Sequence, residues 1–354
     1  MKLMKFYTSP LFDLPTPFSI NLFWNFGFIL GFITTIQVIS GLFLSMLFIP
    51  SESDAFFSII HIMRDSNSGW FIRLIHSNVA SLIFLCVYIH LARGLYTSSF
   101  KTKSHAWNSG VTIFIIVMAA AFFGYVLPWG QMSYWGATVI TNIASAIPYI
   151  GIYLVKWMWG NFSVSQPTLN RFFSIHFIVP FFMLMMMVIH IILLHSTGSS
   201  NPMGSKEDME KIEFQIMFTI KDFLFFSSIF SLVFISISNY PDIFMDPENM
   251  NEANPLKAPV HIQPEWYFLF AYAILRSITS KLGGVLALIF SILILFFIQI
   301  KGLSKVSGKF SPIVKLSFWI KVSSFLILTF VGMKPVELPF SVIGKVSSFL
   351  YFFI

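Results

Sequence analysis

The chain has 354 residues, of which 56% are hydrophobic and only 10% charged, and its net charge is +7. Soluble globular domains carry about 25% charged residues, so most of this surface must face lipid rather than water. The single cysteine, Cys86, excludes an internal disulfide, a thiolate iron–sulfur cluster and a Cys-x-x-Cys-His haem attachment. The basic residues form no aromatic-interleaved patch that would bind nucleic acid, and they are better interpreted as markers of membrane topology.

A membrane-spanning helix needs about 20 mostly apolar residues. Such segments occur at 22–49, 71–97, 108–127, 172–195, 222–239, 282–300 and 313–333, and a shorter eighth begins near Phe340. The sequence therefore predicts an all-α membrane protein with eight transmembrane helices, of which the last is short. Two domains are expected: residues 1–205 with the first four spans, and residues 206–354 with the last four.

Two long connections interrupt these spans. Residues 128–170 are too polar to cross a bilayer and predict amphipathic helices at the membrane interface. Residues 240–281 contain five prolines and predict a structured loop rather than a helix. With eight spans, Lys and Arg are more frequent on the side of the N-terminus than on the opposite side, which predicts that the N-terminus lies inside.

Four histidines lie within predicted spans, where ionisable residues are rare and usually functional. His76 and His90 belong to the second span, and His176 and His190 to the fourth. Both pairs are 14 residues apart, an interval that turns a helix by about 1,400° and advances it by about 21 Å. The second and fourth spans run parallel, so His76 is level with His176, and His90 with His190. Two facing imidazoles at two depths predict two bis-histidine iron sites.

The alternative is that these histidines are hydrogen-bonded core residues or form a proton relay. That interpretation suits a single intramembrane histidine, whereas two pairs with the same spacing on parallel helices favour haem. Four glycines repeat the interval, Gly27 with Gly41 and Gly110 with Gly124. Helices approach a flat porphyrin closely only where no side chain intervenes, which suits a four-helix bundle around two haems. Close packing between helices also favours glycine, but it does not explain the matching interval.

Arg73 and Arg93 each lie three residues from a paired histidine and near a membrane face. Their guanidinium groups are suited to pair with haem propionates. The alternative is that both arginines only mark the membrane topology or extend their charged ends to the membrane interface, which is common for such residues.

Several stretches resemble cytochrome b of respiratory complex III. They are RLIHSNVASLIFLCVYIHLARGLY, GYVLPWGQMSYWGATVITN, RFFSIHFIVPFF, VIHIILLHSTGSSNP and PEWYFLFAYAILRS. The likeness runs from about Asn25 to Pro339, and one continuous chain resembles the mitochondrial or bacterial form, whereas the plastid-type relative is divided between two chains. The resemblance implies a subunit of quinol:cytochrome c reductase, which runs a Q cycle in the mitochondrial inner membrane, with its N-terminus on the matrix side.

The resemblance also assigns cofactors and partners. It implies that His76 and His176 bind a low-potential haem b near the intermembrane face, and that His90 and His190 bind a high-potential haem b near the matrix. Trp107 is also expected to be a cofactor-binding residue. The expected partners are a Rieske iron–sulfur subunit and a c-type cytochrome subunit, since one cysteine cannot hold their cofactors, together with other complex III subunits in a homodimeric complex.

An outer site for ubiquinol oxidation is implied by the Pro-Glu-Trp-Tyr segment, in which Glu265 is the only acid near the apolar end of its loop. Glu265 is the expected proton acceptor. The resemblance implies further residues at this site: Tyr267 and Tyr272 as catalytic residues, and Tyr125, Gly136, Ile140 and Phe268 as binding residues. The alternative for Glu265 is an acid at a helix N-terminus after Pro264. The residues alone do not separate these two interpretations, and the resemblance favours function.

An inner site for ubiquinone reduction is implied by His195, which ends the fourth span, and by Asp222, which opens the fifth. Asp222 and Lys221 resemble proton-delivery residues, and His195 resembles a ligand of a quinone carbonyl. The alternatives are an interfacial histidine and an N-capping aspartate. Phe28 and Ser196 depart from the family pattern here.

Two other classes of protein remain possible from the residues alone. A proton-coupled transporter would use the intramembrane histidines as a relay. A di-haem membrane anchor of a dehydrogenase would keep the histidines but would not need the Pro-Glu-Trp-Tyr segment.

Overall fold

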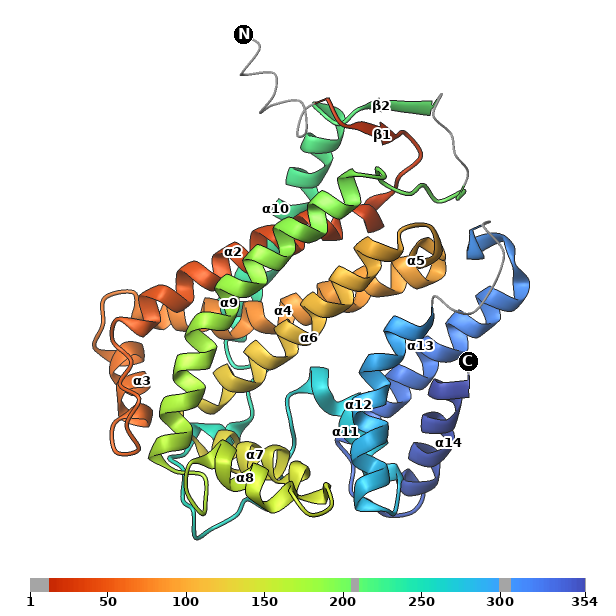
Figure 1. Ribbon diagram of the computed structural model, residues 1–354. Coiled ribbons are helices and arrows are strands. Elements are labelled where there is room, and N and C mark those ends of the chain that lie inside the picture. The colour runs from red at the N-terminus through yellow and green to blue at the C-terminus, as the bar shows by residue number, and fades with distance from the viewer. Residues whose placement is uncertain (1–12, 205–209, 299–306, 354) are drawn as a thin grey trace.

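A computed structural model describes residues 13–204, 210–298 and 307–353. The first four long helices form a bundle in which α2 packs along α4, and α6 packs along α9 (Figure 1). Their bounds are α2 (Phe26–Ser45), α4 (Gly69–Tyr96), α6 (Ser104–Val126) and α9 (Gln166–His195). The helix α4 is the most enclosed of the four, whereas α9 exposes many large apolar side chains. Such exposure suits lipid, because lipid does not penalise apolar surface as water does.

The second half of the chain contributes α10 (Met217–Asn239) and a separate group of helices (Figure 1). That group consists of α11 (Leu269–Ser277), α12 (Lys281–Phe297), α13 (Pro312–Gly332) and α14 (Phe340–Phe353). The helices α11, α13 and α14 share one apolar core that includes Phe270, Ile274 and Leu328. The expectation of an all-α membrane protein is confirmed.

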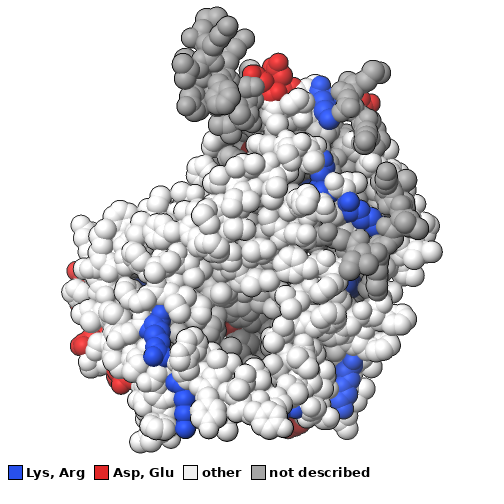
Figure 2. All heavy atoms as spheres, in the orientation of Figure 1, with Lys and Arg blue, Asp and Glu red and all other residues white. Residues whose placement is uncertain are grey.

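Six described helical segments are long and apolar enough to cross a membrane, namely the four helices of the bundle, α10 and α13. The other two expected spans are the shorter helices α12 and α14, of 17 and 14 residues. The expected span at 282–300 extends past Phe297 to positions that lie partly outside the described residues. On the face shown in Figure 2, charged side chains lie mainly above and below a broad uncharged band, as expected of a molecule with a lipid belt.

Short helices connect the spans at one end of the bundle. The interfacial helices expected within residues 128–170 are present as α7 (Gln131–Asn142), the 3₁₀ helix η2 (Ile143–Ala146) and α8 (Gly151–Trp159). The connection between α2 and α4 contains α3 (Ala55–Arg64), which the sequence analysis did not predict. The short helix α5 (Ser99–Thr102) joins α4 to α6 at the other end.

The connection at 240–281 was expected to be a loop without helix, and this expectation is wrong. It contains the 3₁₀ helices η4 (Pro247–Met250) and η5 (Trp266–Phe268), followed directly by α11. The five prolines all precede Glu265, so they do not prevent a helix in the apolar stretch that follows. Further short elements are β1 (Pro15–Pro17), which pairs antiparallel with β2 (Lys211–Glu213), and the 3₁₀ helices η1 (Leu22–Trp24) and η7 (Gly308–Phe310).

Candidate functional site

The four histidines meet as two pairs between α4 and α9. The ring centroids of His76 and His176 are 6.3 Å apart, and those of His90 and His190 are 6.5 Å apart. Metal–imidazole nitrogen bonds are about 2.0–2.1 Å long and the ring centre lies about 1.1 Å further, so two imidazoles on opposite sides of one metal have centroids about 6.3 Å apart. The ring spacing of both pairs therefore fits one shared iron.

Hydrogen bonds orient three of the four rings. His76 Nδ1 lies 3.0 Å from the Ser40 hydroxyl, and His190 Nδ1 lies 2.8 Å from the Ser109 hydroxyl. His176 Nδ1 lies 2.9 Å from the Ala120 carbonyl oxygen. A partner at Nδ1 fixes the ring and leaves Nε2 for a metal. His90 Nδ1 has no hydrogen-bond partner among the described residues.

Ser40 and Ser109 were not among the residues predicted from the sequence. A signal was present, because each serine directly precedes one of the regularly spaced glycines on the same helix. The serine and the glycine next to it both contact the same histidine.

Each of the four glycines lies against one of the paired histidines. A Cβ atom on Gly41 would lie 3.0 Å from His76 Cε1, and one on Gly110 would lie 3.2 Å from His190 Cε1. A Cβ on Gly27 would contact His90 at 3.5 Å, and a Cβ on Gly124 would collide with His176. The glycines therefore make room for the imidazole rings, which gives their 14-residue interval a direct steric cause.

Replacing Gly124 with Val is expected to displace the His176 ring, because the added carbon atoms occupy its position. The variant should lose the cofactor held at the level of His76 and His176, measured as haem content of the purified protein. The matched control is Gly31→Ala in α2, where the nearest atom, Met187 Cε, is 4.0 Å from the added Cβ. Equal haem content in both variants would contradict this role of Gly124.

The two arginines near the histidines have different surroundings. The Arg93 guanidinium carbon lies 5.0 Å from the Trp24 ring centroid. Arg93 Nε and Trp24 Nε1 are buried and have no hydrogen-bond partner among the described residues, so both donors are free for an anionic group such as a propionate. Arg73 instead lies near the carboxylates of Asp242 and Glu265.

Trp107 is engaged in helix packing. Its indole nitrogen donates to the Leu295 carbonyl at 2.8 Å, which joins α6 to α12, and a Cβ on Gly94 would collide with its ring. Trp107 therefore packs between α4 and α12, and its N–H group binds the Leu295 carbonyl rather than a histidine of either pair.

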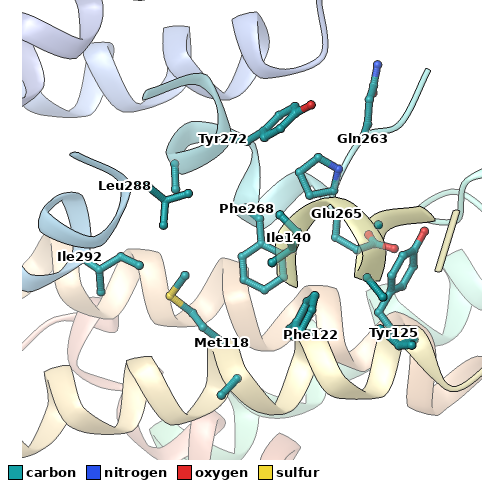
Figure 3. A pocket seen from close by; sticks show the side chains of 16 residues that line it. Met118, Phe122, Tyr125, Ile140, Gln263, Glu265, Phe268, Tyr272, Leu288 and Ile292 are labelled. Carbon is teal, nitrogen blue, oxygen red and sulfur yellow. The ribbon is translucent and has the colours of Figure 1, made fainter. Parts of the chain in front are cut away.

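A cavity of about 240 Å³ opens between α6, α7, η5, α11 and α12 (Figure 3). Its wall includes apolar side chains such as Met118, Phe122 and Ile292. Six of the residues that the resemblance implies for the outer site line this cavity: Tyr125, Gly136, Ile140, Glu265, Phe268 and Tyr272. An apolar cavity with few polar groups is typical of a small-molecule site.

Glu265 supplies the carboxyl group of this cavity. Figure 3 shows its carboxyl end next to the hydroxyl of Tyr125, with which it shares a hydrogen bond. Burial raises the pKa of Glu265 to about 7, and the nearby Asp246 acts in the same direction, while Arg73 and the Tyr125 hydrogen bond oppose the shift. A carboxyl group with this pKa exchanges protons near neutral pH, as a general base must.

Glu265 occupies the N-cap position of η5, which is the place that the alternative interpretation, an acid at a helix N-terminus, gives it. Its side chain accepts no capping hydrogen bond and lines the cavity. The segment is held by its neighbours instead. The Trp266 indole donates to the Ser81 hydroxyl of α4 at 3.2 Å, and the Tyr88 hydroxyl donates to the Tyr267 carbonyl at 2.5 Å. These two bonds join the segment to α4, and the Glu265 side chain lines the cavity.

Tyr267 is not among the residues that line the cavity. Its ring is buried and stacks on Phe84 of α4, with centroids 3.8 Å apart and an interplanar angle of 2°. Burial raises the pKa of Tyr267 well above its ordinary value. The structure thus places Tyr267 in the core between η5 and α4, where it fixes the segment that carries Glu265.

The residues expected at the inner site lie at the opposite end of the bundle. Asp222 is buried and shares a hydrogen bond with Asn25, a residue that the sequence analysis did not select. The helix α10 begins at Met217, so the alternative of Asp222 as an N-capping residue is wrong. Lys221 Nζ donates to the Ile20 carbonyl at 2.8 Å. His195 is the last residue of α9, as expected.

The two departures from the family pattern have ordinary contacts. The Phe28 ring meets the Phe223 ring edge to face at 5.2 Å, which packs α2 against α10. The Ser196 hydroxyl donates to the Leu193 carbonyl at 2.8 Å.

The fold and the histidine geometry define a helical membrane protein in which two histidine pairs meet at two levels of a four-helix bundle. Residues 11–198 match the family model described as Cytochrome b/b6/petB, and residues 252–352 match Cytochrome b(C-terminal)/b6/petD. The chain belongs to the cytochrome b family. Haem b is the cofactor that this family implies, and the two histidine pairs fit it in residue type and spacing.

A solved structure confirms the assignment to the type of cytochrome b found in bc complexes. Its title is "Hyperthermophilic respiratory Complex III", and one of its chains superposes on this one with a TM-score of 0.94 and 30% sequence identity. The match covers 99% of this chain and 94% of that chain.

Proposed function

We propose that this chain is the cytochrome b subunit of a quinol:cytochrome c reductase. In this proposal, quinol is oxidised in the cavity beside Glu265, and quinone is reduced near His195, Lys221 and Asp222. The observation that carries the proposal is the combination of two histidine pairs at two depths with an acid-bearing apolar cavity near one of them. A bound haem would supply one-electron redox chemistry at each pair.

The described residues would hold the two haems at different depths of the bundle. His76 and His176 would hold the haem nearer the outer cavity, because Arg73, one turn from His76, lies near Glu265. His90 and His190 would hold the second haem nearer the inner face. Hydrogen bonds at Nδ1 would hold the imidazole planes in place when the haems are bound. The partners are the Ser40 hydroxyl for His76, the Ser109 hydroxyl for His190 and the Ala120 carbonyl for His176.

Quinol oxidation releases two protons together with two electrons, so the outer site needs a proton acceptor. Glu265 would accept a proton from a quinol hydroxyl group, because its carboxyl group faces the cavity and its pKa is raised to about 7. The Tyr125 hydroxyl would stabilise the carboxylate through their hydrogen bond. The apolar wall would exclude water from the reacting quinol.

The proposal includes partners and a location. One electron from each quinol would pass to a Rieske iron–sulfur subunit and then to a c-type cytochrome, because the single Cys86 cannot hold either cofactor. We further propose a homodimeric complex in the mitochondrial inner membrane, with the N-terminus on the matrix side and proton translocation through a Q cycle. A di-haem anchor of a dehydrogenase would not need the Glu265 cavity, which favours the reductase.

The proposal predicts two b haems per chain in the purified complex, together with quinol-dependent reduction of a c-type cytochrome. Pyridine haemochrome quantitation against protein concentration measures the first, and a steady-state assay with a short-chain ubiquinol measures the second. Fewer than two haems per chain would refute the bis-histidine assignment. Two haems without quinol:cytochrome c reductase activity would favour a membrane anchor instead.

A further inference from the structure

The C-terminal turn of α13 is bound by one arginine from α11. Arg276 donates to the carbonyl oxygens of Val331 at 3.0 Å, Gly332 at 2.8 Å and Lys334 at 3.1 Å. The last carbonyl groups of a helix have no partners within the helix and carry partial negative charge, so they favour a guanidinium group. The Val331 carbonyl also accepts from the Lys334 backbone N–H at 3.0 Å. Arg276 forms no ion pair with a described carboxylate, which leaves these carbonyls as its main polar partners.

The same guanidinium covers one face of Tyr272. Its central carbon lies 4.4 Å from the Tyr272 ring centroid, within the range of a cation–π contact. The two residues are four apart on α11, which places them on one face of the helix. Among the described residues, the Tyr272 hydroxyl reaches only the Ile262 carbonyl, at a long 3.5 Å, so the guanidinium is the close charged partner that holds the ring.

The α13 turn also contacts the cavity wall from a second direction. Gln263, another lining residue, donates from its side-chain nitrogen to the Met333 carbonyl at 2.9 Å. A Cβ atom on Gly332 would lie 2.5 Å from the Leu269 carbonyl oxygen, so only glycine allows α13 to pack this closely against the start of α11. Two lining residues on either side of Glu265 are therefore fixed to one turn of a helix outside the cavity.

We propose that Arg276 is a positioning residue for the outer site, which fixes the Tyr272 ring in the cavity wall by bridging it to the C-terminal turn of α13. Arg276 itself is not among the residues that line the cavity, so it acts through Tyr272. A wall fixed before the ligand enters avoids an ordering cost on binding, so the effect falls on quinol affinity rather than on chemistry. The inference rests on the proposed quinol oxidation at this cavity.

The test is a double-mutant cycle in the assembled complex, with Arg276→Gln, Tyr272→Leu and both together, assayed with a short-chain ubiquinol. Arg276→Gln is expected to raise the quinol KM about tenfold and to change kcat by less than about twofold. In the Tyr272→Leu background, Arg276→Gln should raise KM by no more than about twofold, because its target is gone. The same tenfold rise in both backgrounds overturns the proposal.

A second arginine provides the matched control. Arg171 of α9 donates to the Trp157 and Met158 carbonyls at the C-terminal end of α8, but it stacks on no lining residue of the cavity. Arg171→Gln should leave the quinol KM unchanged within about twofold. An equal rise in KM for Arg171→Gln would show that any lost helix-end contact loosens the protein, and it would overturn the specific role of Arg276.

Assembly is monitored by the haem spectra of each variant. If Arg276→Gln does not assemble, Arg276→Lys replaces it in the same cycle, because lysine keeps the charge near the ring but cannot bridge three carbonyl groups. Failure of both variants to assemble would show that Arg276 is required for folding and would overturn the proposal. A wild-type complex that does not oxidise quinol refutes the proposed function, whereas an active wild type with additive variants refutes only the role of Arg276.

Discussion

Replacing His176 with Leu is expected to lower the haem content of the purified complex from two b haems per chain to one. The His76–His176 pair has a ring spacing that fits binding to one shared iron, and leucine cannot bind a metal. His90 and His190 lie about 21 Å along their helices from the first pair, so their site should persist. Quinol:cytochrome c reductase activity should fall to background, because the proposed electron path from the outer cavity would lose its nearer haem.

Haem quantitation and the reduced-minus-oxidised spectrum measure this outcome. The control is His61→Gln in α3, an exposed histidine whose ring pairs with Asp65, and this variant should keep both haems and full activity. A His176→Leu complex with two haems would contradict the ligand assignment. It would favour the alternative in which the intramembrane histidines relay protons.

Replacing Glu265 with Gln is expected to slow quinol oxidation by about 100-fold, the lower end of what a positioned general base contributes. Glutamine keeps the size of the side chain and can still bond to the Tyr125 hydroxyl, but it cannot accept a proton from quinol. Both haem spectra should be unchanged, because Glu265 makes no contact with the histidine pairs in the described structure. Loss of the haem spectra would instead assign Glu265 a structural role.

The pH dependence of the reaction follows from the same residue. The pKa of Glu265 is raised to about 7, so the carboxylate that would accept the proton is present above that pH and is lost as the pH falls through it. Wild-type kcat/KM should therefore fall about tenfold per pH unit below about pH 7, and the Glu265→Gln variant should lack this limb. Glu252→Gln, an exposed acid of the same connection, serves as the control and should keep the wild-type profile.

The sequence by itself determined the features that follow from helix geometry. Spanning helices are recognisable because about 20 apolar residues are needed to cross a bilayer. The common interval of His76–His90 and His176–His190 predicted two depths, because the rise and turn of a helix are the same in every protein. The ends of α10 and the count of long spans were less well determined, since helix ends depend on local contacts. The helices α3 and α11 were missed because they are too short to give a spanning signal.

Only the tertiary structure decided which side chains meet. Tyr125 and Glu265 are 140 positions apart in the chain, and no local pattern places their side chains in one cavity. Residue type and motif did not distinguish Tyr267 from Tyr272, yet the first stacks in the core on Phe84 and the second lines the cavity. The glycines show the same division: their interval is a property of the helices, while their contact with the imidazole rings depends on how α2 and α6 pack against α4 and α9. Periodicity within a helix is local and can be read along the chain, whereas the partners of a side chain are set by packing between segments that are distant in sequence.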